Sequence, residues 1–122
     1  MSVLIETELE AIVENIIEGI RNKKGQEIVC INISALKNSV CNNFIICHGD
    51  SSTQVNAIAQ GVEQAMEENM NEKVRRKQGY ENSQWIVLDY IDVVVHIFQK
   101  EYRDYYNLEN LWADGKVIRF DN

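Results

Sequence analysis

The chain has 122 residues with a formal net charge of −7, and 45% of them are hydrophobic and 25% charged. This length predicts one domain, residues 1–122, with a core of its own and no room for a second. The acidic balance argues against a non-specific nucleic-acid binder, which needs a dense positive surface to displace phosphate counterions. No apolar run approaches the roughly 18 residues that a membrane-spanning segment requires.

The N-terminal segment differs from a targeting peptide in its charge. Signal and transit peptides are basic near their start, whereas MSVLIETELEAIVENI contains glutamates and no lysine or arginine. We therefore expect the mature chain to begin at or near Met1 and to remain in the cytoplasm, without contact with a membrane.

The first half of the chain predicts one helix followed by two strands. Apolar residues recur at helical spacing over 9–20, and Gly25 then ends the helix. Two β-rich runs, Glu27–Ile33 and Phe44–Cys47, come next. A polar loop through Lys37–Asn43 separates them.

A second amphipathic helix is predicted after Cys47. Residues 51–53 supply hydroxyl groups that can cap its N-terminus. The helical pattern ends near Asn69–Asn71, and Lys73–Gly79 is interpreted as the connection to the next strand. The apolar stripe of this helix consists of Val55, Ile58, Ala59, Val62 and Met66.

The last third predicts two strands, a helix and a short final strand. Trp85–Tyr90 and Val93–Gln99 are rich in valine, isoleucine and aromatic residues. Helical spacing then runs from Lys100 to Trp112, and Val117–Phe120 can add an edge strand. The order α-β-β-α-β-β-α implies an α/β fold, with a single mixed β-sheet of four to five strands and helices packed on it.

Candidate catalytic groups are few and poorly matched. His96 and Asp89 form the one obvious acid–base pair, but no nucleophile accompanies them, so a packing or interface role is expected for His96. Cys47 and His48 are neighbours on a strand and point to opposite faces, so the imidazole cannot easily activate the thiol.

A metal site also has weak support in the sequence. Metal-ligand spacings such as C-x-x-C or H-x-x-x-H are missing, so we expect no metal ion and no cofactor. Asp89 and Asp92 can either hold a divalent ion or cap backbone NH groups of their turn. The odd number of thiols in apolar surroundings predicts free cysteines: Cys30, Cys41 and Cys47.

The second half carries one basic cluster and an aromatic-rich segment. The cluster is either a solvated connection or a local phosphate contact with RNA: Lys73, Arg75, Arg76 and Lys77. Both tryptophans and four of the five tyrosines fall within 85–112. Large aromatic side chains that are partly buried beside charge are typical of interaction hot spots, although plain core packing is the alternative.

Three motifs resemble the ribosomal silencing factor family, also called RsfS or Iojap. Residues 85–98 are similar to its pattern W-I-x-x-D-x-x-D-V-V-V-H-x-F, and 103–112 match R-x-x-Y-x-L-E-x-L-W. Residues 44–52 resemble the stretch F-I-I-x-x-G-x-S-S. One departure is Ile91, where the family commonly has a glycine that would ease a tight turn.

The resemblance implies a protein that works by binding and not by catalysis. Members of the family bind large-subunit ribosomal protein fourteen, block joining of the ribosomal subunits and repress translation, and they form dimers when free. Their fold is similar to that of nucleotidyltransferases, but this chain lacks the Gly-Ser and Asp-x-Asp motifs of those enzymes. A small nucleotide-binding or nucleotidyltransferase-like enzyme that uses Asp50, Asp89 and Asp92 is the alternative.

We predict that the partner surface draws on the two C-terminal motifs. Glu109 is either an acidic partner for a basic residue across the interface or a brace for Arg103. Because strand residues alternate between faces, not all of the predicted side chains can touch the partner. The predicted set is Trp85, Tyr90, His96, Phe98, Tyr106, Glu109 and Trp112.

Overall fold

A computed structural model of the chain describes residues 6–36 and 41–120, so part of the predicted polar loop lies outside the described residues. The helices are α1 (Glu6–Asn22), α2 (Ser52–Met70), α3 (Lys100–Tyr106) and α4 (Leu108–Leu111). The strands are β1 (Gln26–Asn32), β2 (Asn43–Gly49), β3 (Arg76–Gln78), β4 (Trp85–Asp89), β5 (Val93–Gln99) and β6 (Lys116–Phe120). Among the described residues, no helix combines the length and apolar character that crossing a membrane requires.

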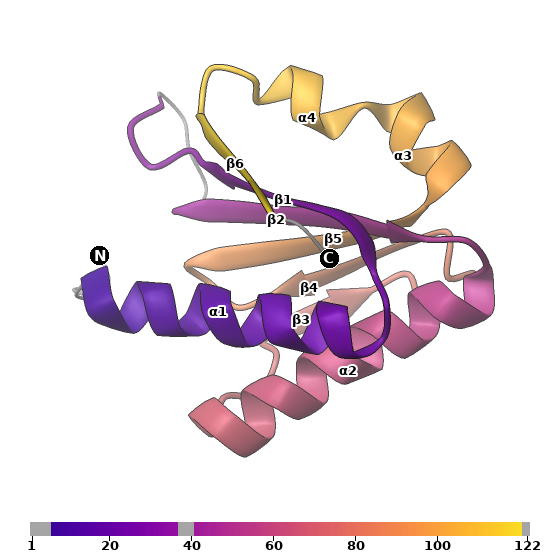
Figure 1. Cartoon of the computed structure of the whole chain (residues 1–122), viewed down its shortest axis with the longest axis horizontal. Helices are drawn as coiled ribbons and strands as arrows, with labels where there is room; N and C mark the ends of the chain where they lie inside the picture. Colours follow the sequence, from indigo (N-terminus) through magenta and orange to yellow (C-terminus); the bar gives the residue numbers. More distant parts are fainter. Residues whose placement is uncertain (1–5, 37–40, 121–122) are drawn as a thin grey trace.

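The strands form one mixed sheet in the order β3-β4-β5-β2-β1-β6. The central pair, β2 and β5, is parallel, and the other neighbours are antiparallel. Helices α1 and α2 lie on one face of this sheet, and α3 and α4 lie on the other (Figure 1). The predicted α/β class is confirmed, but the described residues form a sheet of six strands where four to five were expected.

Strand β3 accounts for the extra strand, because its sequence carries no strand signal. Arg76 pairs with Asp89 and Gln78 with Val87, and all three residues of β3 are exposed. Long polar side chains on an exposed sheet edge leave no alternating pattern, so the segment resembles a loop in sequence. The predicted edge strand near the C-terminus is present as β6.

The predicted single helix after Lys100 is broken in two. Asn107 adopts the left-handed conformation with φ of 47°, and its NH group donates to the carbonyl of Arg103 at 2.9 Å. Asparagine tolerates this conformation better than most residues, so it ends α3. Asn71 ends α2 in the same way, within the range where the sequence predicted the end of that helix.

Glycines allow α1 and α2 to pack closely against each other. A Cβ atom on Gly19 would lie 2.8 Å from the carbonyl oxygen of Gly61, which is closer than side chains tolerate. The helices together cover an apolar layer, to which α1 contributes Ile16, Ile17 and Ile20. The opposite layer contains Val29, Ile31, Ile33, Phe44, Ile46 and Phe98, with Tyr102, Leu108 and Trp112 of the α3–α4 region packed on it.

The turn between β4 and β5 holds a residue in a disfavoured conformation. Ile91 has φ of 75°, and its side chain is 53% exposed. Its NH group donates to Oδ1 of Asp89 at 2.7 Å, so Asp89 caps this turn. A β-branched residue in this region costs about 1–3 kcal/mol. The departure from glycine noted in the sequence therefore falls where glycine would remove strain.

Candidate interaction surface

Four of the predicted partner-binding residues form one aromatic cluster beside α3. The Trp85 ring stacks on Phe98 with centroids 4.9 Å apart and meets Tyr106 at 4.8 Å. The indole Nε1–H of Trp85 donates to Nδ1 of His96 at 3.1 Å. Strand pairing produces this cluster, because Trp85 lies opposite Phe98 and His96 lies two residues earlier on β5.

The hydrogen bond from Trp85 determines which nitrogen of His96 carries the proton. An indole only donates, so Nδ1 accepts and Nε2 is protonated in the neutral ring. His96 is 7% exposed, and its Nε2 has no hydrogen-bond partner among the described residues. The Phe44 ring lies edge-on to it, with centroids 5.0 Å apart. Burial lowers the pKa of His96 to about 4.

We expect NMR titration to give a pKa near 4 for His96, well below the value of about 6.5 for a free histidine. Between pH 4 and 6.5 the His96 ring is protonated in the unfolded chain but neutral in the folded chain. The free energy of unfolding is therefore highest above about pH 6.5 and falls as the pH drops toward 4. The total loss from this group is about 3 kcal/mol. A ring that titrates near 6.5 would contradict the buried placement.

The members of the cluster differ in what they can touch. Phe98 is fully buried, and His96 is nearly so, hence both support the surface from beneath. Trp85 and Trp112 are half-buried, and Tyr106 is 49% exposed. The Trp112 ring meets Phe44 edge-on at 5.2 Å, which places it on the same face of the sheet.

Next to these aromatic residues, part of the sheet stays accessible. Val87, Asp89 and Val94 are half-buried although they lie on inner strands of the six-stranded sheet. By strand alternation they share the face of Trp85, while Ile86 and Leu88 point to α1 and α2. We call Trp85, Val87, Asp89 and Val94 the open strip.

Tyr90 is separated from the other predicted residues by the sheet. It packs against the apolar layer under α1 and α2, and its hydroxyl group has no hydrogen-bond partner among the described residues. Burial raises the pKa of Tyr90, and Glu63, Glu67 and Glu72 add to the effect. The structure therefore does not bring Tyr90 together with Trp85.

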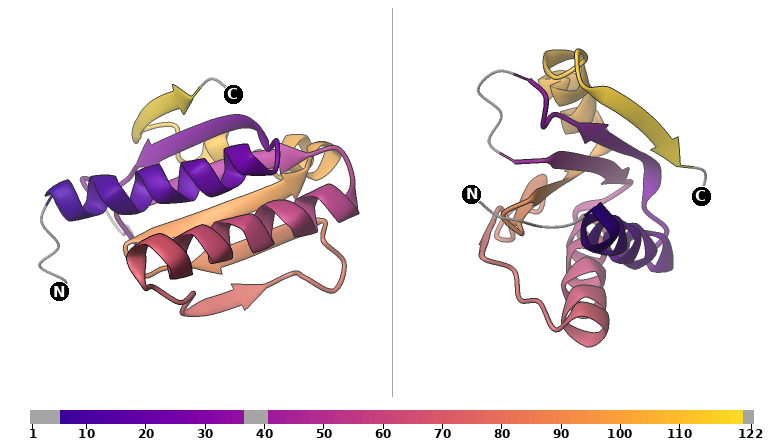
Figure 2. Two further views of the ribbon diagram at one scale, coloured as in Figure 1. Left: turned by 60° about the horizontal axis from the view of Figure 1, so that its bottom comes forward. Right: turned by 90° about the vertical axis from the view of Figure 1, so that its left-hand side faces the viewer.

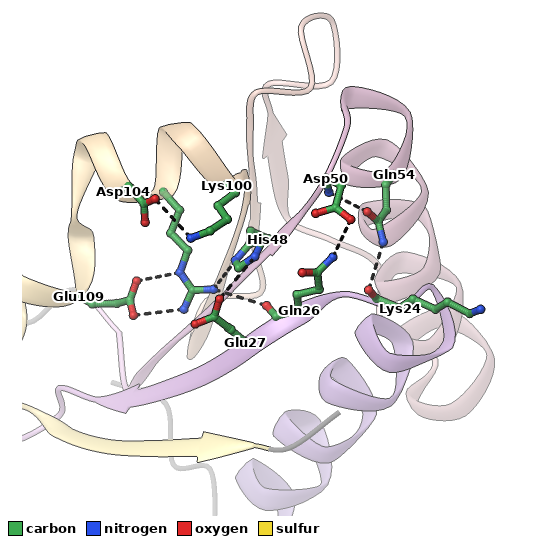
Figure 3. A network of polar contacts seen from close by, with 10 residues as sticks. Lys24, Gln26, Glu27, His48, Asp50, Gln54, Lys100, Asp104 and Glu109 are labelled. Carbon is green, nitrogen blue, oxygen red and sulfur yellow. Dashed lines mark hydrogen bonds and ion pairs between the residues drawn. The ribbon is translucent and has the colours of Figure 1, made fainter.

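Glu109 forms a two-point ion pair with Arg103. Its Oε1 accepts from Nε of Arg103 at 2.8 Å and its Oε2 from Nη2 at 3.1 Å. Nη1 lies 2.8 Å from Nδ1 of His48 and 3.4 Å from the carbonyl of Gln26. Figure 3 shows Glu109 of α4, His48 of β2 and the carbonyl group of Gln26 in β1 arranged around this guanidinium group. Of the two roles predicted for Glu109, this geometry corresponds to the second, in which Glu109 holds the Arg103 side chain in place.

His48 lies inside this network and away from Cys47. It is 1% exposed, and burial and Arg103 lower its pKa, while Glu27 raises it. Cys47 belongs to the opposite layer under α1 and α2, as strand alternation predicted. All three cysteines are free; Cys30 and Cys47 are buried, and Cys41 is half-buried.

Comparison with known proteins identifies the family. A sequence model described as "Ribosomal silencing factor during starvation" matches residues 6–122. The chain belongs to the ribosomal silencing factor family. A Ribosomal silencing factor RsfS of Halalkalibacterium halodurans is 37% identical over 105 residues, which cover 86% of this chain and 88% of that protein. The RsfS of Bacillus subtilis is 37% identical over 100 residues, 82% of this chain and 83% of its own.

Solved structures show the same fold. A crystal structure of a protein from Chromobacterium violaceum superposes with a TM-score of 0.82 at 34% identity and covers 87% of both chains. A crystal structure from Bacillus halodurans gives a TM-score of 0.77 at 34% identity, covering 89% of this chain and 97% of that one. The motifs that carried the resemblance are thus embedded in the matching fold.

The carboxylates of the enzymatic alternative do not meet in this silencing-factor fold. Asp50 follows β2, whereas Asp89 and Asp92 flank the turn before β5. Because β2 and β5 are parallel and seven residues long, these positions lie at opposite ends of the strands, about 20 Å apart. Asp50 instead accepts from Gln26 at 2.9 Å. Among the described residues, no three metal-ligating side chains gather.

The basic cluster divides between the two faces of β3. Lys77 forms an ion pair with Glu63 at 3.2 Å on the α2 side, and its ammonium group also lies over the Tyr80 ring at 5.4 Å from the centroid. Arg76 pairs with Asp89 in the sheet and points to the other face, next to the open strip. Lys73 and Arg75 are exposed.

Two exposed apolar residues of the C-terminal helices were not among the predicted site residues. Tyr105 is 79% exposed and contacts Tyr106 edge-on at 5.1 Å, and Leu111 is 73% exposed. Leu111 belongs to the helical spacing predicted from Lys100 to Trp112, but the break at Asn107 changes which residues of α4 face the sheet. The exposed Tyr105 was recognisable only as part of the aromatic-rich segment.

Proposed function

We propose that this silencing factor binds large-subunit ribosomal protein fourteen through the open strip and the aromatic residues beside it, Tyr106 and Trp112. By occupying the face where the small subunit docks, it blocks subunit joining and represses translation. The family supports a ribosomal role, since its relatives carry the name of silencing factors.

The observation that carries the proposal is the accessible apolar strip on the sheet. Helices α3 and α4 cover only part of their face of the sheet, and Val87 and Val94 remain half-buried there beside Trp85. Partly exposed aromatic and aliphatic side chains on a rigid sheet lose little conformational entropy on binding, which suits an interface anchor. His96 and Phe98 hold the Trp85 ring in place from below.

The mechanism requires no chemical step, because a bound protein excludes the small subunit by its volume. The net charge of −7 would accelerate an encounter with a basic ribosomal partner. Of the basic cluster, Arg76 is the residue placed beside the open strip, and it is the candidate for a contact with RNA at its margin. Tyr90 is left out of the proposed surface because it lies on the other face.

Cosedimentation with isolated ribosomal subunits tests the proposal. We expect the protein to sediment with the large subunit and not with the small one, and to reduce the formation of joined ribosomes in the same mixture. Binding to neither subunit would exclude the proposed partner. Binding to the large subunit without an effect on joining would exclude the steric mechanism.

A further inference from the structure

The second edge of the sheet, β6, offers free main-chain groups. β6 pairs with β1 on one side, and no described strand lies beyond it (Figure 2). Val117 is 40% exposed and Ile118 46% exposed. An edge strand with apolar side chains is a template on which another extended segment can add.

A groove runs beside this edge, between β6 and α1. Its volume is about 340 Å³. Ile118 lies opposite Cys30 and Phe120 opposite Ile28 in the β1–β6 pairing, so both point to the α1 side. Its lining includes Glu10, Val13, Glu14, Cys30, Ile118 and Phe120.

The charge of the groove comes from α1. Glu10 and Glu14 line it, and both are exposed. Within the described part of the chain, neither forms an ion pair. Two carboxylates four residues apart on one helix repel each other, so a cation placed between them would be stabilised.

We propose that β6 and this groove bind an extended, basic segment of a protein partner by strand addition. Main-chain groups of the segment pair with the free edge of β6, and alternate apolar side chains enter the groove against Val13 and Ile118. A lysine or arginine on the same face of the segment, two residues from an apolar one, meets Glu10 and Glu14. An added strand fits better than a helix, because the edge of β6 supplies a row of main-chain partners.

This surface is distinct from the open strip. The strip lies on β4 and β5, on the face opposite α1, whereas the groove lies at the β6 edge on the α1 side. A partner in the groove therefore leaves the strip accessible. The inference thus extends beyond the proposed binding of the ribosomal protein and does not depend on it.

Two synthetic heptapeptides test the proposal by NMR titration of the full, ¹⁵N-labelled chain. In one, every second residue is in turn valine or lysine and the residues between them are threonine, so that both valine and lysine can face the groove. The other has glutamate in place of each lysine. We expect the lysine peptide to shift amide signals of β6 and α1 and to bind at least about tenfold more tightly, a difference of about 1.4 kcal/mol. Glu14→Lys should abolish this preference.

Glu18→Lys is the matched control, because it makes the same charge change on the same helix outside the groove. It should keep the preference for the lysine peptide. Equal binding of both peptides, or shifts away from β6, would overturn the proposal. So would a dimer in light scattering that Ile118→Asp dissociates, because a second copy would then fill the groove. Glu14→Lys should still sediment with the large subunit, so failure here is separable from failure of the proposed function.

Discussion

Trp85→Ala is expected to weaken binding to the large ribosomal subunit by about 30- to 900-fold, or roughly 2–4 kcal/mol. The substitution removes the largest side chain of the open strip and the ring contacts with Phe98 and Tyr106. It also leaves Nδ1 of His96 without its donor. Cosedimentation over a range of protein concentrations measures the change in affinity.

Two further variants separate the binding effect from loss of stability. Trp85→Phe keeps an aromatic ring but lacks the indole NH group, so it should lose less affinity than the alanine variant. Tyr90→Ala removes a partly buried aromatic side chain from the opposite face and should bind the subunit like the unmodified protein. Unchanged binding by Trp85→Ala, or an equal loss in Tyr90→Ala, would refute the proposed surface.

Arg103→Ala is expected to lower the free energy of unfolding by about 3 kcal/mol. Arg103 is 6% exposed, and its guanidinium group contacts Glu109, His48 and the carbonyl of Gln26. Removing it leaves a carboxylate and a buried ring nitrogen without their donor. Urea unfolding followed by circular dichroism measures the loss.

Lys100→Ala provides the matched comparison on the same helix. Lys100 pairs with Asp104 at 3.3 Å, but the two side chains are 55% and 66% exposed. Exposed pairs of this kind contribute less than about 0.5 kcal/mol, because solvent screens them. If both alanine variants unfolded at the same urea concentration, Arg103 would not have the structural role inferred here.

The layers of the fold were predictable because each long element carries a clear period. The helical spacing over 9–20 and the β-branched runs around Val95 predicted α1 and β5. Strand alternation also separated Cys47 from His48 correctly. Strand β3 was missed because Arg76, Lys77 and Gln78 are polar and exposed, and only pairing with β4 makes them a strand.

The candidate site was less predictable, since it depends on which face each side chain occupies after the chain folds. The motif at 85–98 put Trp85 and Tyr90 in one predicted set, although strand alternation assigns them to opposite faces, and Tyr90 packs with Leu88 under α1 and α2. Sequence could not decide between the two roles of Glu109, because the decision depends on its distance to Arg103.

Helices α3 and α4 depend on their contacts with the sheet for stability. These helices have seven and four residues, too few to persist without the sheet. They contact the sheet through the hydrogen bond of Arg103 to Gln26 and through the packing of Tyr102 and Trp112. We therefore expect α3 and α4 to unfold locally at a lower free energy than the central strands, and their amide hydrogens to exchange with solvent before those of β2 and β5.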